Sequence, residues 1–281
     1  MILMESSAAR ALAHIASQAS GGPAGPSVRV TLHFHPDRLV GQRLLLDVIA
    51  DDGVYRSQFE TGISNGGLTA YPGGDRWRWE SSIFGGAYDD RPGAERPKYG
   101  SLNFRGRRIG GSPRFGSAYL RLAPHVLART SFCYPDSVFA PQHFGVADRL
   151  SPLIEMAEAG DRDPLDDYVE AHVHGEVHLA RDVEALVLDP CYRKTATEAA
   201  ARRLGCPIEW HDGFTLPVSE LRRNPSYRGP EFVKLGLSLA EDGLLTAGMI
   251  GAAARTGSYD QQALKRVWHY VARFGTHEFK I

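Results

Sequence analysis

Two short segments of the chain carry histidines at alternate positions, the spacing that puts side chains on one face of a β-strand. The segment VRVTLHFH contains His33 and His35. The segment YVEAHVHGEVH contains four groups of interest: Glu170, His172, His174 and His178. Neutral imidazoles suit metal ions or substrate hydroxyls, and a carboxylate on the same strand face is well placed to act on a ligand. These residues are the first candidates for chemistry.

Hydrophobic alternation predicts the elements that position these residues. Residues 28 to 35 alternate apolar and polar side chains up to Pro36, which predicts a strand. Asp37 is expected to cap a helix that runs to the turn at Asp52-Gly53. In the second segment the apolar side chains at positions 169, 171 and 173 are expected to face the core, with Glu170 on the polar face of a half-buried strand.

The region between the two segments is rich in glycine. Residues 59 to 118 contain FETGISNGG and RPKYGSLN and show no long periodic run, which predicts functional loops between short strands. Neither GxGxxG after a strand nor GxxxxGK[ST] occurs there, so the ordinary nucleotide-binding folds are excluded, although backbone amides of such loops can hold phosphates. Acyl transfer is disfavoured because we expect no strand-to-helix nucleophile elbow of the GxSxG type, and no cysteine has a neighbouring histidine.

The composition is that of a folded, water-soluble protein. The chain has 281 residues and a net charge of −1, with 43% hydrophobic and 23% charged residues, which excludes disorder as its default state. Three cysteines without CxxC spacing favour a reducing, cytoplasmic compartment. No apolar run is long enough to cross a bilayer, so we expect no membrane span.

The charges are unevenly distributed along the chain. Residues 91 to 121 hold eight basic side chains and the single acid Glu95, which predicts an anion-binding face. Residues 155 to 189 hold eleven acids and only two basic side chains, Arg162 and Arg181. The two segments are expected either to face or to neutralise each other.

Strands in the middle and helices at both ends indicate an α+β fold. We expect an N-terminal helix and linker over residues 1–27, an α+β catalytic domain over residues 28–221, and a C-terminal helical extension over residues 222–281 packed on that domain.

Four motifs, HFHPDR, FETGISNGG, RPKYGSLN and PRFGS, resemble a bacterial family of unknown function across residues 28 to 190. The order of elements is similar to that of the ADP-ribosyltransferase superfamily. That resemblance implies split central antiparallel sheets, a catalytic Glu170 and no bound metal. It also implies that NAD, as the substrate, is held by seven residues: His35, Arg38, Thr61, Gly62, Ser64, Tyr99 and Gly100.

The resemblance also implies a role for each main residue. Glu170 would stabilise the oxocarbenium-like state reached when the nicotinamide–ribose bond breaks, and would hold the ribose 2′-hydroxyl. Tyr99 would stack on nicotinamide, His35 would contact the adenosine-side ribose, and Arg38 or Arg96 would contact the pyrophosphate. A macromolecular acceptor, with nucleic acid as the expected class, would bind along residues 91 to 121.

The sequence is also compatible with two other functions. The first alternative is a metal-dependent hydrolase that uses the two histidine groups: His33, His35, His172, His174 and His178. The second is a non-catalytic nucleic-acid-binding protein that uses the basic segment of residues 91 to 121.

Overall fold

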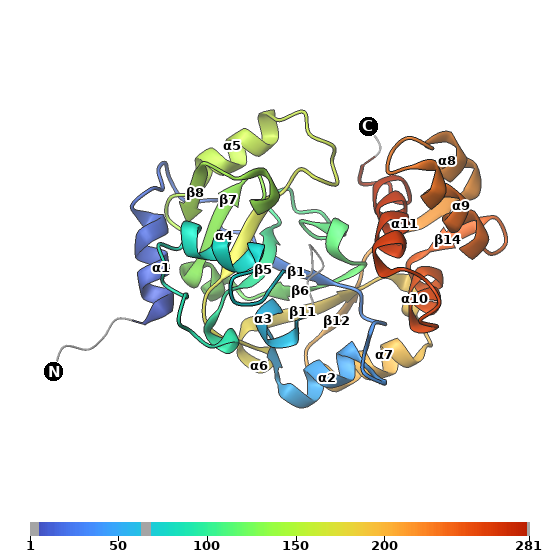
Figure 1. Cartoon of the computed structure of the whole chain (residues 1–281), viewed down its shortest axis with the longest axis horizontal. Helices are drawn as coiled ribbons and strands as arrows, with labels where there is room; N and C mark the ends of the chain where they lie inside the picture. The colour runs from blue at the N-terminus through green and yellow to red at the C-terminus, as the bar shows by residue number, and fades with distance from the viewer. Residues whose placement is uncertain (1–5, 63–68, 280–281) are drawn as a thin grey trace.

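The computed structural model describes residues 6–62 and 69–279 and has an eight-stranded sheet at its centre (Figure 1). In spatial order its strands are β12 (Ile208–Trp210), β11 (Val183–Leu188), β6 (Ala118–Leu122), β1 (Val30–Phe34), β5 (Lys98–Leu102), β9 (Val169–Val173), β7 (Thr130–Tyr134) and β8 (His143–Val146). Every neighbouring pair is antiparallel except β11 and β12, which are parallel. Three two-stranded ribbons join β2 (Leu39–Val40) to β3 (Arg43–Leu44), β4 (Val54–Tyr55) to β10 (Val177–His178), and β13 (Thr215–Pro217) to β14 (Leu244–Thr246).

Helices surround this sheet on several sides. In chain order they are α1 (Ser7–Ala16), α2 (Leu45–Asp52), α3 (Gln58–Thr61), α4 (Asp75–Ile83), α5 (Ser151–Ala159), α6 (Leu179–Asp182), α7 (Ala196–Ala201), α8 (Val218–Arg223), α9 (Pro230–Leu239), α10 (Ala247–Arg255) and α11 (Gln261–Phe274). Helices α8 to α11 gather in a lobe at the side opposite α1 (Figure 1). The fold is thus α+β, as the sequence predicts.

The central strands are buried on both faces. Val169, Ala171 and Val173 of β9 belong to the main hydrophobic cluster, as the alternation predicts. The other face of β9 was expected to be half-exposed, and that expectation is wrong, because Glu170 is only 6% exposed and His172 is fully buried. Phe84, which follows α4, lies edge-on to His172 and helps to exclude water from this face.

The first strand and the late strands occupy the predicted places, but the segment after the first strand differs. Asp37 caps no helix, because residues 39–44 form the β2–β3 ribbon and α2 begins only at Leu45. The carboxylate of Asp37 instead pairs with Arg255 of α10 at 2.8 Å. A long-range ion pair thus replaces the local capping bond.

The glycine-rich region was expected to form loops between short strands, and it contains the short strand β5 but also a helix, α4, that was not expected. Strand β5 and helix α4 both lie between residues 59 and 118. Gly100 of β5 lies so close to β1 that an added Cβ would be 2.5 Å from the carbonyl oxygen of Thr31. This glycine therefore permits close contact between the two strands.

The C-terminal lobe has its own hydrophobic cluster. Trp268 and Tyr270 of α11 pack there with Phe214, Leu216 and Leu221, which precede residue 222 in the chain. The cluster also includes Ile109, Leu165 and Tyr192, so the C-terminal helices share their core with side chains from the rest of the fold. No helix in the described part of the chain is long and apolar enough to span a membrane.

Ion pairs connect the basic segment to the acidic one. Five of the eight basic side chains between residues 91 and 121 pair with acids of the fold: Arg96 with Glu80, Arg105 with Asp167, Arg108 with Asp212, Arg114 with Asp166, and Arg121 with both Glu184 and Glu209. Three of these arginines pair with carboxylates of residues 155–189. The two segments therefore neutralise each other in part.

Candidate functional site

A pocket of about 300 Å³ opens where strands β1 and β5 separate. The pairing of these strands covers only Val30 with Leu102 and Thr31 with Ser101, while β1 continues to pair with β6 as far as Phe34. The end of β1 and the beginning of β5 are thus left apart, and side chains from both line the opening. We call this the fork pocket. Apolar side chains of α2 and Tyr55 complete its wall.

Most of the residues predicted to hold NAD meet in this pocket. Six predicted residues line it: His35, Arg38, Thr61, Tyr99, Gly100 and Glu170. They come from segments up to 135 positions apart in the chain. Gly62 follows Thr61 but is not among the lining residues, and Ser64 lies outside the described residues.

Glu170 is the buried carboxylate of the fork pocket. Its Oε2 accepts hydrogen bonds from the backbone N–H and the hydroxyl of Ser137, at 3.2 and 3.1 Å, and its Oε1 lies 3.1 Å from Nε2 of His172. Burial alone would raise the pKa of this carboxyl, but the hydrogen bonds and the nearby Arg76 outweigh burial and lower it. Glu170 is therefore ionised at neutral pH.

A chain of hydrogen bonds extends from Glu170 across the buried face of the sheet. Nδ1 of His172 lies 3.2 Å from Oγ of Ser131, which lies 2.9 Å from Nε2 of His174. Nδ1 of His174 lies 2.7 Å from the hydroxyl of Tyr88. We call this series the relay.

One set of proton positions satisfies every bond of the relay. An ionised Glu170 can only accept, so Nε2 of His172 donates to it, and the hydroxyl of Ser131 can donate to Nδ1 of the same ring. The Ser131 oxygen then accepts from His174, which accepts from Tyr88. Burial lowers the pKa of His174 well below its usual value, which keeps this ring neutral.

Helix α4 supplies a buried charge cluster next to Glu170. The carboxylate of Glu80 pairs with Arg96 at 2.6 Å, and both side chains are almost fully buried. The hydroxyl of Tyr99 donates to Glu80 at 2.6 Å. The guanidinium of Arg76 lies 4.3 Å from the ring centre of Tyr99 and borders the fork pocket.

Arg76 and Glu80 were not predicted as site residues. Nη1 of Arg76 is buried and has no hydrogen-bond partner among the described residues, so this donor is available for a ligand. The spacing of Arg76 and Glu80 by four residues, one helical turn, was a usable signal. It was missed because the segment was interpreted as loops between short strands, without a helix.

The two histidines of the first strand have different surroundings. His33 lies 3.2 Å from the carbonyl oxygen of Gly116 through Nδ1, and its Nε2 accepts from the backbone N–H of Ser112 at 3.3 Å, so both ring nitrogens are occupied. His35 is partly exposed, lines the pocket and packs edge-on against Trp268. Burial lowers the pKa of each to about 3, so both are neutral.

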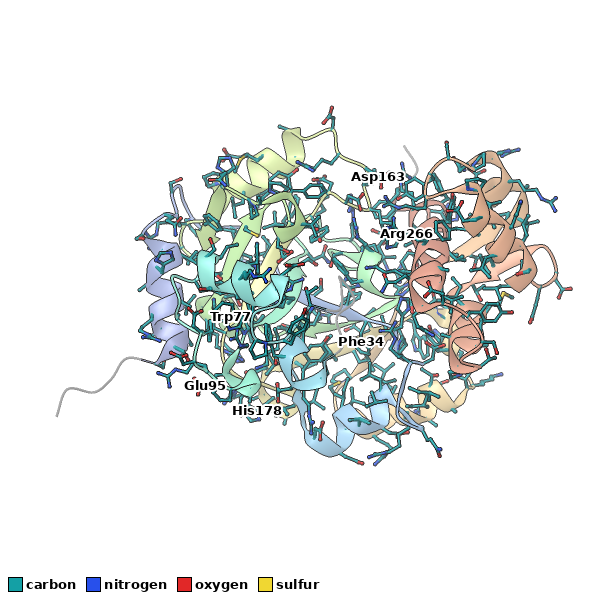
Figure 2. The ribbon with its side chains drawn as sticks, viewed as in Figure 1. Phe34, Trp77, Glu95, Asp163, His178 and Arg266 are labelled. Atoms are coloured by element: carbon teal, nitrogen blue, oxygen red, sulfur yellow. The ribbon has the colours of Figure 1, made fainter. Side chains whose placement is uncertain are left out.

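The structure does not gather the histidines of the metal hypothesis around one point. His178 lies on β10 and contacts the exposed Glu176, and Figure 2 shows it well away from Phe34, which ends β1. A different group could hold a metal ion: the ligand atoms of Cys133, Glu170 and His172 all lie within 4.8 Å of one another. This group shares its carboxylate with the fork pocket.

The chain belongs to the family described as protein of unknown function, DUF3626. The family model matches residues 29–156 and 147–274, which together include the fork pocket and most of the C-terminal lobe. No curated protein matches the chain.

Proposed function

We propose that this protein is an NAD-dependent ADP-ribosyltransferase that breaks the nicotinamide–ribose bond in the fork pocket and transfers ADP-ribose to a macromolecular acceptor. The observation that carries the proposal is the meeting of His35, Tyr99 and Glu170 around one pocket: His35 directly follows β1, and the other two lie on the neighbouring strands β5 and β9. The order His, aromatic and late Glu is the order that the resemblance to that superfamily implies. The central sheet is one continuous eight-stranded sheet and not the pair of split sheets that the resemblance implies, but β1 and β5 stop pairing beyond Thr31, which leaves room for a ligand.

The chemistry needs negative charge beside a sugar that becomes cationic. When the bond between the ribose C1′ and the nicotinamide nitrogen breaks, the electron pair leaves with nicotinamide, which becomes neutral. The ribose then carries the positive charge as an oxocarbenium-like species. The ionised Glu170 stabilises this charge, and burial strengthens the effect because little water screens it.

The second half of the reaction restores a neutral sugar. A nucleophile of the acceptor, or water in the hydrolytic version, forms the new bond to C1′ and releases its proton to solvent. We assign binding of the ribose 2′-hydroxyl to Glu170, whose Oε1 and Oε2 are already oriented by His172 and Ser137. These contacts hold the carboxylate in position before the substrate binds.

The remaining residues bind and orient the dinucleotide. Arg38 and Arg76 offer positive charge for the pyrophosphate, and His35 offers a neutral ring nitrogen for a ribose hydroxyl. The stacking of Tyr99 on nicotinamide stays a prediction. One face of that ring already carries Arg76, so stacking would use the opposite face or displace the guanidinium.

The test follows the release of nicotinamide from NAD by chromatography, with and without nucleic acid as acceptor. The purified protein is compared with Glu170→Gln, which keeps the size and the accepting oxygen of the side chain but removes its charge. We expect the variant to lose about 10²–10³-fold in turnover, the usual effect of removing one transition-state stabilising group. The control is Glu176→Gln, because Glu176 is exposed on the same segment of chain.

Two results would contradict this proposal. One is equal turnover by the wild type and Glu170→Gln. The other is no turnover by a wild-type protein whose thermal unfolding shows it to be folded. In that case the group formed by Cys133, Glu170 and His172 favours the second candidate, a metal-dependent hydrolase. Elemental analysis of the same sample, and activation by added zinc or manganese, test that function directly.

A further inference from the structure

A second and larger cavity, of about 470 Å³, lies next to the fork pocket. Its walls come from the segment of residues 35–41, from the 3₁₀ turn η2 (Pro113–Phe115), and from helices α10 and α11 of the C-terminal lobe. We call it the lobe pocket. His35, Arg38 and Phe115 line both cavities, so the two are neighbours across these three side chains.

The lobe pocket is lined by more positive than negative side chains. Its basic residues are Arg38, Arg114, Arg255 and Lys265, and its only acid among the described lining residues is Asp37. Asp37 is already paired with Arg255, at 2.8 Å. Arg114 pairs with Asp166, which lies outside the pocket.

Lys265 is the basic side chain without a compensating acid. No carboxylate of the described chain lies within ion-pair distance of it, although many other arginines have such a partner. The charges that act on it most strongly are all positive: Arg114, Arg266, Arg38 and Arg228. A half-buried ammonium group in such surroundings is stabilised by a bound anion.

The remaining walls are apolar and partly aromatic. Ile250, Leu264, Phe115 and Trp268 supply this surface. The indole N–H of Trp268 donates to the carbonyl oxygen of Pro113 at 2.9 Å, which fixes the ring in place. Position 251 of α10 requires glycine, because a Cβ added to Gly251 would overlap the carboxylate of Asp37. The wall is therefore closely packed and preformed.

From these features we propose that the lobe pocket binds a phosphate-bearing ligand that also carries a flat, largely apolar ring, which is the chemistry of a nucleotide. Arginine and lysine side chains bind phosphate oxygens, and the partly exposed ring of Phe115, which lies in a wall fixed by Trp268, offers a surface for the ligand's ring. The pocket is too large for phosphate alone, since cavities of 300–1,000 Å³ are typical for small organic ligands. The C-terminal lobe thus contributes a binding site of its own.

The proposal is independent of the reaction assigned to Glu170. The experiment therefore uses the full-length Glu170→Gln protein, in which turnover should be lost, so that NAD stays intact as a competitor. Adenosine 5′-monophosphate is titrated into this protein by calorimetry, and adenosine serves as the matched probe without phosphate. We expect the monophosphate to bind at least about 10-fold more tightly, the effect of one charge-assisted contact or more.

The same titration is repeated with three further substitutions. Lys265→Gln should weaken binding of the monophosphate about 10-fold, whereas Lys265→Arg, which keeps the charge, should restore most of it. Lys234→Gln is the control, because Lys234 is an exposed lysine of the same lobe. Thermal unfolding of each variant shows whether the lobe remains folded.

Competition with NAD shows whether the lobe pocket binds a phosphate of NAD or that of a separate nucleotide. Displacement of the monophosphate by NAD means that the lobe pocket holds the far half of the dinucleotide, and simultaneous binding means that it holds a separate nucleotide. Either result agrees with a phosphate site. Equal affinity for the monophosphate and adenosine, no binding of either, or equal effects of Lys265→Gln and Lys234→Gln would each overturn the proposal.

Discussion

The fork pocket and the lobe pocket are neighbours with opposite electrostatic character. The fork pocket contains an ionised, deeply buried carboxylate, Glu170, held by hydrogen bonds from His172 of its own strand and from Ser137, which follows β7. The lobe pocket contains an unpaired ammonium group, Lys265, surrounded by guanidinium groups. The first is built into the central sheet, and the second depends on how helices α10 and α11 pack against it.

This difference suggests a division of tasks between sheet and lobe. A buried carboxylate stabilises a substrate group that becomes positive, whereas a cluster of basic groups binds a group that is always negative. A dinucleotide contains both kinds of group, at different positions along its length. Changes in one pocket should therefore affect a different measured quantity from changes in the other.

The largest expected effect concerns the buried ion pair between Glu80 of α4 and Arg96, next to the fork pocket. Glu80→Ala leaves Arg96 buried without its partner, which should lower the free energy of unfolding by about 3–5 kcal/mol. Asp75→Ala on the same helix removes only an exposed pair with Arg78 and should cost less than about 1 kcal/mol. Urea denaturation followed by circular dichroism measures both. Similar losses for the two variants would mean that α4 is not anchored through Glu80.

The next prediction tests whether the fork pocket and the lobe pocket act independently. Glu170→Gln should lower nicotinamide release by about 10²–10³-fold and leave binding of adenosine 5′-monophosphate within a factor of two to three. Lys265→Gln should weaken that binding about 10-fold. Steady-state kinetics and calorimetry on both variants give a two-by-two comparison. If either variant lost both properties while remaining folded, the two pockets would be one functional unit.

A smaller effect is expected from the relay behind Glu170. Ser131→Ala removes the donor to Nδ1 of His172, so this ring is no longer fixed as a donor to Glu170. Turnover should fall about 10-fold, the scale of one buried hydrogen bond of 0.5–1.5 kcal/mol. The pH dependence of kcat should also shift to higher pH, because Glu170 loses part of what keeps it ionised. An unchanged pH profile would make the relay merely structural.

The smallest effect is the pH dependence of binding to the lobe pocket. Burial and the surrounding positive charges lower the pKa of Lys265 to about 8. This side chain is therefore charged below pH 8 and becomes neutral above it, so affinity for the monophosphate should fall a few-fold between pH 7 and 9.5. The neighbouring charged or titratable groups are His35, Asp37, Arg38, Arg114, Arg228, Arg266 and His269.

Neither the two imidazoles nor the guanidinium groups among these neighbours should titrate in that interval. His35 has a pKa of about 3 and burial keeps that of His269 well below its usual value, so both rings stay neutral. The guanidinium groups stay charged. Lys265→Arg serves as the control, since its affinity should stay constant over the same range. A parallel decline in both proteins would assign the effect to another group.

Several features of the site were predictable from local sequence. The alternation in residues 28–35 and 168–174 predicts two strands and places Glu170 opposite the apolar residues of its strand. The contribution of Arg76 and Glu80 was not predicted, because glycines and aromatic residues concealed a short helix with little amphipathic character. Asp37 was misinterpreted for a related reason, since a capping residue and an ion-pair partner look alike in sequence.

By itself the sequence determined which residues lie on the polar side of each strand, since that depends only on the two-residue period of an extended chain. It also determined the α+β character and the candidate carboxylate. Only the tertiary structure decided that β1, β5 and β9 are neighbours, that β1 and β5 separate, and that α10 and α11 form a second pocket beside them. These features depend on contacts between segments about 70 or more residues apart, which no local period encodes.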